Sequence, residues 1–173
     1  MSKTISVFWS GFNIKKSTDF YFNKFRKERE NYHHHRYKAK RHPEKYVTII
    51  LDGMDNSKTH LPRERRISKE HANVSRLKSH VVGAIVHSGL SSHGKEIFAC
   101  LDLFEWPHDP NLTANALICV LDKWNRLHGL APVLYLQLDN CIRENKNNVI
   151  ICFLTLLVDL DIFEMVRCKK MTK

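Results

Sequence analysis

Short runs of hydrophobic residues, separated by polar turns, predict five strands along the chain. The clearest covers residues 46–51, Tyr-Val-Thr-Ile-Ile-Leu, where β-branched and aromatic residues follow one another without a breaker. Comparable runs cover residues 80–86, 96–101 and 133–138, and a weaker one covers residues 164–168. Near-continuous apolarity at residues 46–51 is typical of a central strand that is covered on both faces.

Three segments have helical spacing instead. Residues 18–41 begin after a possible cap at Ser17 and end before Pro43, and their surface is strongly basic. Their apolar stripe consists of Phe22, Phe25, Tyr32 and Ala39. Residues 112–128 follow Asn111, a favourable N-cap, and a further helix is expected at residues 145–160.

The order of these elements, a helix followed by β-β-β-α-β-α-β, predicts an α/β fold. We expect one mixed sheet with helices on both faces in a domain spanning residues 44–173. A basic helical segment at residues 1–43 precedes this domain, and a long basic insertion at residues 56–78 interrupts it. Right-handed crossovers favour the strand at residues 133–138 lying beside the strand at residues 46–51 and parallel to it.

Each of those two strands ends in an acid, Asp52 in one and Asp139 in the other. Parallel neighbours end at the same edge of a sheet, so the two carboxylates should lie close together and repel each other unless a cation sits between them. Hard divalent ions such as magnesium prefer carboxylate oxygens, and paired ions about 4 Å apart promote phosphodiester cleavage. In the alternative interpretation, Asp139 and Asn140 only cap the turn into the next helix. The acids near the end of the third strand, Asp102 and Glu105, are expected at the opposite edge.

Positive charge is concentrated in the first half of the chain. Residues 1–80 contain 19 Lys and Arg against 8 Asp and Glu, whereas the remainder contains 9 and 10. This asymmetry favours a polyanionic partner, DNA above all, and leaves an anionic membrane surface or a merely solvated surface as alternatives. The candidate nucleic-acid contacts in the insertion are Lys58, Arg63, Arg65, Arg66, Arg76 and Lys78.

The cysteines, the apolar runs and the histidines narrow the class of protein further. Five scattered cysteines form no C-x-x-C pair, and most lie in apolar runs, which suggests buried thiols in a reducing, intracellular setting. The longest apolar run, residues 149–158, is shorter than the roughly 20 residues that a bilayer span needs. His33, His34 and His35 point in different directions on a helix, so we expect surface or phosphate-facing histidines there. No small-molecule cofactor is indicated, and the oligomeric state stays open.

Two stretches resemble a known family. YVTIILDGMDNSKTHLP (residues 46–62) and LYLQLDNCIRENKNNVIICFL (residues 134–154) are similar to a eukaryotic transposon-derived domain with IDGMDxSK-like and LQxDNxxRENKN-like motifs. The order of elements resembles the ribonuclease H-like fold of DDE transposases and retroviral integrases. The similarity extends from about residue 28 to residue 170, and its second motif is the more specific.

The resemblance implies a nuclear domain for metal-dependent DNA strand transfer or cleavage. Asp52 and Asp139 would be catalytic ligands of magnesium or manganese. The residues expected to line the site are Asp55, Asn140, Arg143, Glu144, Asn145 and Lys146. The family's third acid is expected in a His- and acid-rich motif after the last strand, and the sequence ends at Lys173 before such a motif. We therefore expect a shortened copy with impaired cleavage, or alternatively a non-catalytic nucleic-acid-binding remnant or a decayed fragment.

Overall fold

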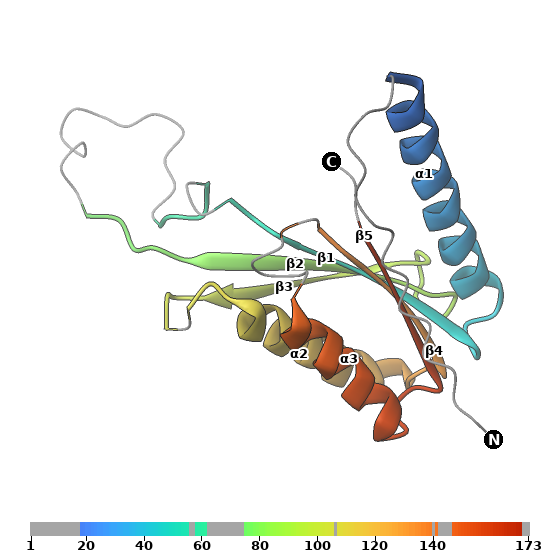
Figure 1. Ribbon diagram of the computed structural model, residues 1–173. Helices are drawn as coiled ribbons and strands as arrows, with labels where there is room; N and C mark the ends of the chain where they lie inside the picture. The colour runs from blue at the N-terminus through green and yellow to red at the C-terminus, as the bar shows by residue number, and fades with distance from the viewer. Residues whose placement is uncertain are drawn as a thin grey trace.

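The computed structural model describes residues 18–55, 58–61, 75–105, 107–139, 141 and 147–170, and only the backbone at residues 18–25 and 170. These residues form three helices and five strands that make an α/β fold (Figure 1). In chain order the elements are α1 (Thr18–Arg41), β1 (Tyr46–Gly53), β2 (His80–His87), β3 (Glu96–Asp102), α2 (Pro110–His128), β4 (Val133–Leu138), α3 (Asn148–Asp159) and β5 (Met165–Lys170).

The five strands form one mixed sheet in the order β3-β2-β1-β4-β5. β2 pairs antiparallel with both β1 and β3, whereas β4 is parallel to β1 and to β5. In the parallel pair, Tyr46 lies opposite Val133 and Leu51 lies opposite Leu138. The prediction that the strand at residues 133–138 lies beside and parallel to the first strand is therefore confirmed.

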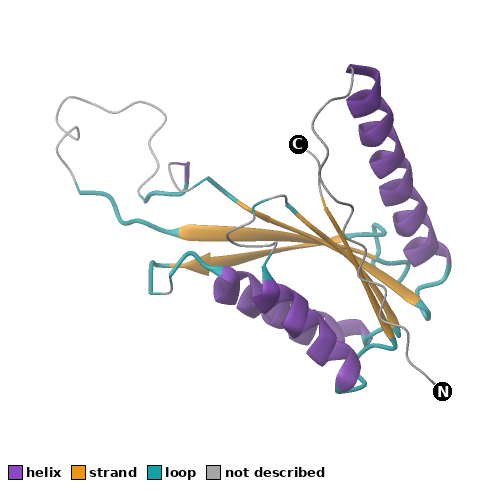
Figure 2. Cartoon of the chain, in the orientation of Figure 1, coloured by secondary structure: helices purple, strands orange, loops and turns teal. Residues whose placement is uncertain are grey.

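The hydrophobic core lies between the sheet and the pair α2 and α3. Alternate side chains of the central strands, such as Val47, Ile49 and Leu136, enter this core because successive residues of a strand point to opposite faces. Among the described residues, Trp124 of α2 is the largest fully buried side chain. Figure 2 shows these two helices on one side of the strands and α1 on the other, so helices on both faces are confirmed.

The interface between α1 and the other face of the sheet is aromatic and polar. The His35 ring stacks on Tyr135 with centroids 3.9 Å apart, and the Tyr32 hydroxyl is 2.9 Å from Nε2 of His87. Ala39 is fully buried near the end of the helix. The expectation that His33, His34 and His35 are all surface groups is therefore wrong for His35, which is half-buried.

Some element boundaries differ from the sequence prediction. α2 begins at Pro110 and its N-cap is Asp109, not Asn111, because the Asp109 carboxylate accepts hydrogen bonds from two backbone N–H groups and proline suits the first helical position. α3 begins at Asn148 rather than residue 145, since the Asn147 side chain caps it. β5 is shifted to Met165–Lys170.

Candidate site at the end of the central strands

Asp52 and Asp139 follow directly on the paired residues Leu51 and Leu138 of two neighbouring parallel strands. Neighbouring strands lie about 4.8 Å apart, so the two acids leave the sheet side by side. Strand alternation assigns both to the side of the sheet that faces α1, since Leu51 and Leu138 enter the core on the other side. Asp52 is exposed and Asp139 is half-buried.

Local structure holds Asp139 at the end of β4. Its Oδ1 accepts a hydrogen bond of 2.8 Å from the backbone N–H of Cys141, which is the Asx arrangement common at turns. This bond fixes the turn that follows β4, as the alternative interpretation expected of Asp139, whereas the helix α3 is capped by Asn147. On the other side of β1, Gly83 of β2 lies opposite Asp52 and places no side chain beside it.

Among the predicted lining residues, only Asp55 lies in the described part of the chain. Asp55 is exposed, and its carbonyl oxygen accepts a hydrogen bond of 2.9 Å from the N–H of Lys58. The others, Asn140, Arg143, Glu144, Asn145 and Lys146, lie outside the described residues.

The two ends of the basic insertion are joined close to this edge. Leu61 and Leu77 form an antiparallel bridge, and each of Thr59 and Ser79 donates a side-chain hydrogen bond to the carbonyl of the other. Lys58 and Lys78 are exposed and Arg76 is half-buried, whereas Arg63, Arg65 and Arg66 lie outside the described residues. The insertion thus brings cationic side chains to the edge at which β1 ends.

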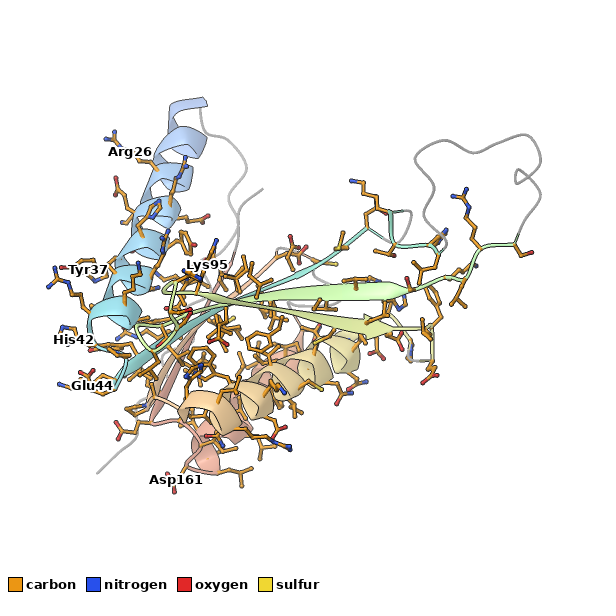
Figure 3. The ribbon with its side chains drawn as sticks, turned by 180° about the vertical axis from the view of Figure 1, so that it is seen from behind. Arg26, Tyr37, His42, Glu44, Lys95 and Asp161 are labelled. Carbon is orange, nitrogen blue, oxygen red and sulfur yellow. The ribbon has the colours of Figure 1, made fainter. Side chains whose placement is uncertain are left out.

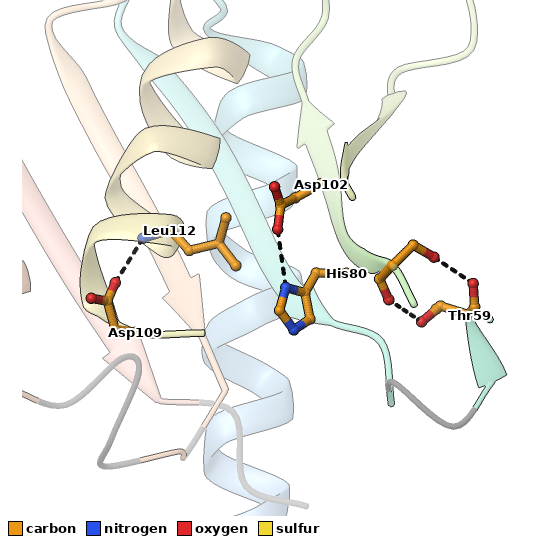
Figure 4. Close-up of polar contacts among 6 residues, drawn as sticks. Thr59, His80, Asp102, Asp109 and Leu112 are labelled. Carbon is orange, nitrogen blue, oxygen red and sulfur yellow. Dashed lines mark hydrogen bonds and ion pairs between the residues drawn. The ribbon is translucent and has the colours of Figure 1, made fainter. Parts of the chain in front are cut away.

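A histidine–aspartate pair that the sequence did not reveal lies at the same edge. Nδ1 of His80 is 3.1 Å from Oδ2 of Asp102, and both side chains are nearly buried (Figure 4). The His80 ring also stacks on Phe104 and on His108, with centroids 3.8 and 4.6 Å away. The expectation that Asp102 and Glu105 leave at the opposite edge is wrong, because β3 pairs antiparallel with β2 and therefore runs in the same direction as β1.

We expect Asp102→Asn to lower the free energy of unfolding by about 1–3 kcal/mol. The substitution replaces a charged acceptor of a buried hydrogen bond by a neutral amide that must reorient to accept. Urea denaturation of the purified variant measures the loss. Asp122→Asn removes an exposed carboxylate that pairs with Arg126 and should change stability by less than about 0.5 kcal/mol. Equal effects of the two substitutions would contradict a structural role for the buried pair.

The electrostatic environment between α1 and the sheet is strongly positive. The pKa of His35 is lowered to about 4, mainly by burial and then by the charges of Lys169, His34, Lys38 and Arg167. Burial, followed by the charge of Arg167, also lowers the pKa of Lys169. A small cavity of about 20 Å³, enough for a single water molecule, lies beside these groups and is lined by Glu28, Thr48 and Gln137 among others.

Further chemistry in the described residues is limited. No three His, Cys, Asp or Glu side chains among them gather in a group that could hold a metal ion. All five cysteines are free, and the expectation of buried thiols is wrong for Cys119 and Cys152, which are exposed on α2 and α3. Burial raises the pKa of the Cys168 thiol to about 11.

Within the described residues, none of the helices has the length and apolarity to cross a membrane.

Comparison with known proteins gives one family. A family model described as "Domain of unknown function (DUF7869)" matches residues 69–173. The matched segment is more than half of the chain and contains Asp139, and it begins after Asp52. No curated protein matches the chain.

Proposed function

The chain belongs to the DUF7869 family, and we propose that it is a transposon-derived domain of the DDE transposase and integrase type, built to bind DNA and divalent metal for phosphoryl transfer. Two features of the sheet support a ribonuclease H-like fold. Its order is β3-β2-β1-β4-β5, and β2 alone runs against the other four strands. That arrangement resembles the fold implied by the two sequence motifs.

The observation that carries the proposal is the position of Asp52 and Asp139. They come immediately after Leu51 and Leu138, which are paired on adjacent parallel strands, so two carboxylates lie together at one edge. Magnesium and manganese fit this donor set, because such ions are commonly held by one or two carboxylates while water and substrate phosphate complete the coordination. A bound ion of this kind would activate the attacking oxygen and stabilise the leaving oxygen.

The chain's own residues supply the rest of the proposed interaction. Asp52 and Asp139 hold the ion, and the Cys141 N–H fixes one oxygen of Asp139. Lys58 and Lys78, exposed where the insertion leaves and rejoins the sheet, would neutralise phosphates of the DNA backbone. We propose that these residues bind metal and DNA, and the resemblance calls for a third carboxylate in strand cleavage.

Metal-dependent thermal stabilisation tests the site directly. Millimolar magnesium or manganese should raise the Tm of the wild-type protein by a few degrees, since a ligand that binds only the folded state stabilises it. Asp52→Asn and Asp139→Asn should each abolish that shift, because each removes one of two anionic ligands. Asp122→Asn, which alters an exposed carboxylate on α2, is the matched control and should keep the shift. An unchanged Tm of the wild-type protein on addition of either metal would contradict the proposed metal site.

The second candidate function is nucleic-acid binding without catalysis. Burial, and then the charge of the neighbouring Arg167, lowers the pKa of Lys169 on β5, and these cations favour a polyanion on this surface whether or not a metal is bound. In this case the logarithm of the affinity for duplex DNA should fall with the logarithm of salt concentration at a slope of about −0.9 per phosphate contacted. Magnesium and the Asp52→Asn substitution would then leave the affinity unchanged, in contrast to the first candidate.

A further inference from the structure

A basic hollow lies at the other end of the sheet, between the last turns of α1 and the turn that joins β2 to β3. Its volume is about 430 Å³, within the usual range for small-ligand sites. Figure 3 shows Tyr37 of α1 and Lys95, just before β3, near this end of the sheet. Since Thr48 lies opposite His87 while Asp52 lies opposite Gly83, the hollow is separated from the two acids by the length of β1.

Close packing fixes the two walls of the hollow relative to each other. The N–H of Gly89 donates a hydrogen bond of 3.0 Å to the carbonyl oxygen of Ala39. A Cβ at Gly89 would lie 2.3 Å from the carbonyl oxygen of Lys40, so only glycine permits this approach. The Lys40 side chain crosses Gly94, where a Cβ would meet Cε at 2.0 Å. The turn between β2 and β3 therefore packs directly against α1.

The turn is also ordered by its own hydrogen bonds. The Ser91 hydroxyl donates to the carbonyl oxygen of Lys95 at 2.8 Å, and the N–H of Gly94 donates to the carbonyl oxygen of Ser91 at 2.9 Å. Gly94 has a φ of +67°, which suits glycine at this position. These bonds hold Ser92 and His93 at the rim, where both side chains are exposed.

The chemistry of the lining is that of an oxyanion site. Lys40 and Arg41 supply two cations, His93 supplies a ring N–H and Ser92 supplies a hydroxyl donor, whereas none of the lining residues is acidic. The Arg41 guanidinium lies over the Tyr37 ring, 5.3 Å from its centroid, which limits its orientations. Guanidinium and ammonium groups both suit the oxygens of phosphate.

We propose that this hollow binds a phosphate group. The group could belong to the backbone of a nucleic acid or to a free phosphate ester, and both present the same oxygens. The hollow does not include Asp52 or Asp139, so phosphate binding there can be tested independently of metal binding at those two acids. Where the ligand is a nucleic acid, the hollow would hold the strand at a second point remote from the sheet edge that carries the two acids.

The test compares two variants of the hollow with one control. Arg41→Gln removes the guanidinium, and Lys40→Met keeps the chain that crosses Gly94 while removing its charge. Arg26→Gln removes one exposed guanidinium, paired with Glu30, from the other end of the same helix. Binding of sodium phosphate, of pyrophosphate and of a short DNA duplex would be measured by titration calorimetry, and the Tm of each variant would verify that it is folded.

We expect each hollow variant to lose at least about tenfold in affinity, and the control to lose much less. A loss seen with pyrophosphate and phosphate alone would identify a free phosphate ester, whereas a loss seen with the duplex alone would identify a nucleic-acid backbone. The proposal is overturned if the Arg41→Gln and Lys40→Met proteins bind all three probes as tightly as the Arg26→Gln protein does. Absence of binding by the wild-type protein to every probe would overturn it as well.

Discussion

Trp124→Ala is expected to lower the free energy of unfolding by about 3–5 kcal/mol, because it removes a large side chain from the centre of the core. Trp124 is 1% exposed, and its ring lies 4.3 Å from the ring of His128. Nε2 of His128 is in turn 2.8 Å from Oε1 of Glu96 on β3. The loss of Trp124 therefore creates a cavity and also loosens the contact that connects the end of α2 to the sheet.

A loss of this size is a large fraction of the about 5–15 kcal/mol that stabilises a typical domain. The Tm should fall by roughly 10 °C, which differential scanning calorimetry would measure. Leu127→Ala is a suitable control because Leu127 lies on the same helix and is 54% exposed, so its truncation should cost little. A similar fall in Tm for both variants would show that α2 contributes to stability through its surface rather than through the core face.

The strands were predictable from sequence because their signal is local. Residues 46–51 are β-branched, aromatic or aliphatic, and the run needs no distant information to form a strand. The adjacency of Asp52 and Asp139 was predictable as well, since the handedness of crossovers leaves few positions for β4. The cap of α2 was predicted at Asn111 and lies at Asp109, because Pro110 suits the first helical position and the cap directly precedes it.

Contacts between distant segments were not predictable in this way. His35 stacks on Tyr135, and nothing in the pattern of either segment indicates that partner. The pair of Thr59 and Ser79 closes the insertion through hydrogen bonds between residues that carry no signature of their own. The position of Asp102 was predictable in principle, because two successive antiparallel pairings make β3 run in the same direction as β1, so that both strands end at the same edge.

Acidification is expected to destabilise the protein between about pH 6.5 and pH 4 through the interface of α1 with the sheet. In the folded protein the pKa of His35 is lowered to about 4, mainly by burial and then by Lys169, His34, Lys38 and Arg167. In the unfolded chain the pKa of histidine is near 6.5, so the unfolded state binds more protons in this interval. The stabilisation is complete above about pH 6.5 and is lost as the pH falls toward 4.

The size of the effect follows from the pKa of His35 and from its partial exposure. A full shift from 6.5 to about 4 would contribute near 3 kcal/mol, and solvent screening of a half-buried group reduces this to about 1–2 kcal/mol. His87, whose pKa is lowered by burial and then by Arg36, acts in the same direction on the same face of the sheet. Protonation of both rings would place additional positive charge beside Arg36 and Lys169, and would weaken the docking of α1.

His35→Phe separates this contribution from the general effect of acid on carboxylates. Phenylalanine can still stack on Tyr135 but cannot bind a proton, so the free energy of unfolding should vary less steeply with pH than in the wild-type protein. His33→Phe is the matched control, because His33 is exposed on the same helix and is not among the charges that lower the pKa of His35, so this variant should keep the wild-type slope. Urea denaturation at intervals from pH 4 to 7 measures the slopes. Identical slopes for the wild-type and His35→Phe proteins would mean that the acid sensitivity arises elsewhere in the fold, and that the polar interface does not set the pH range in which α1 stays docked.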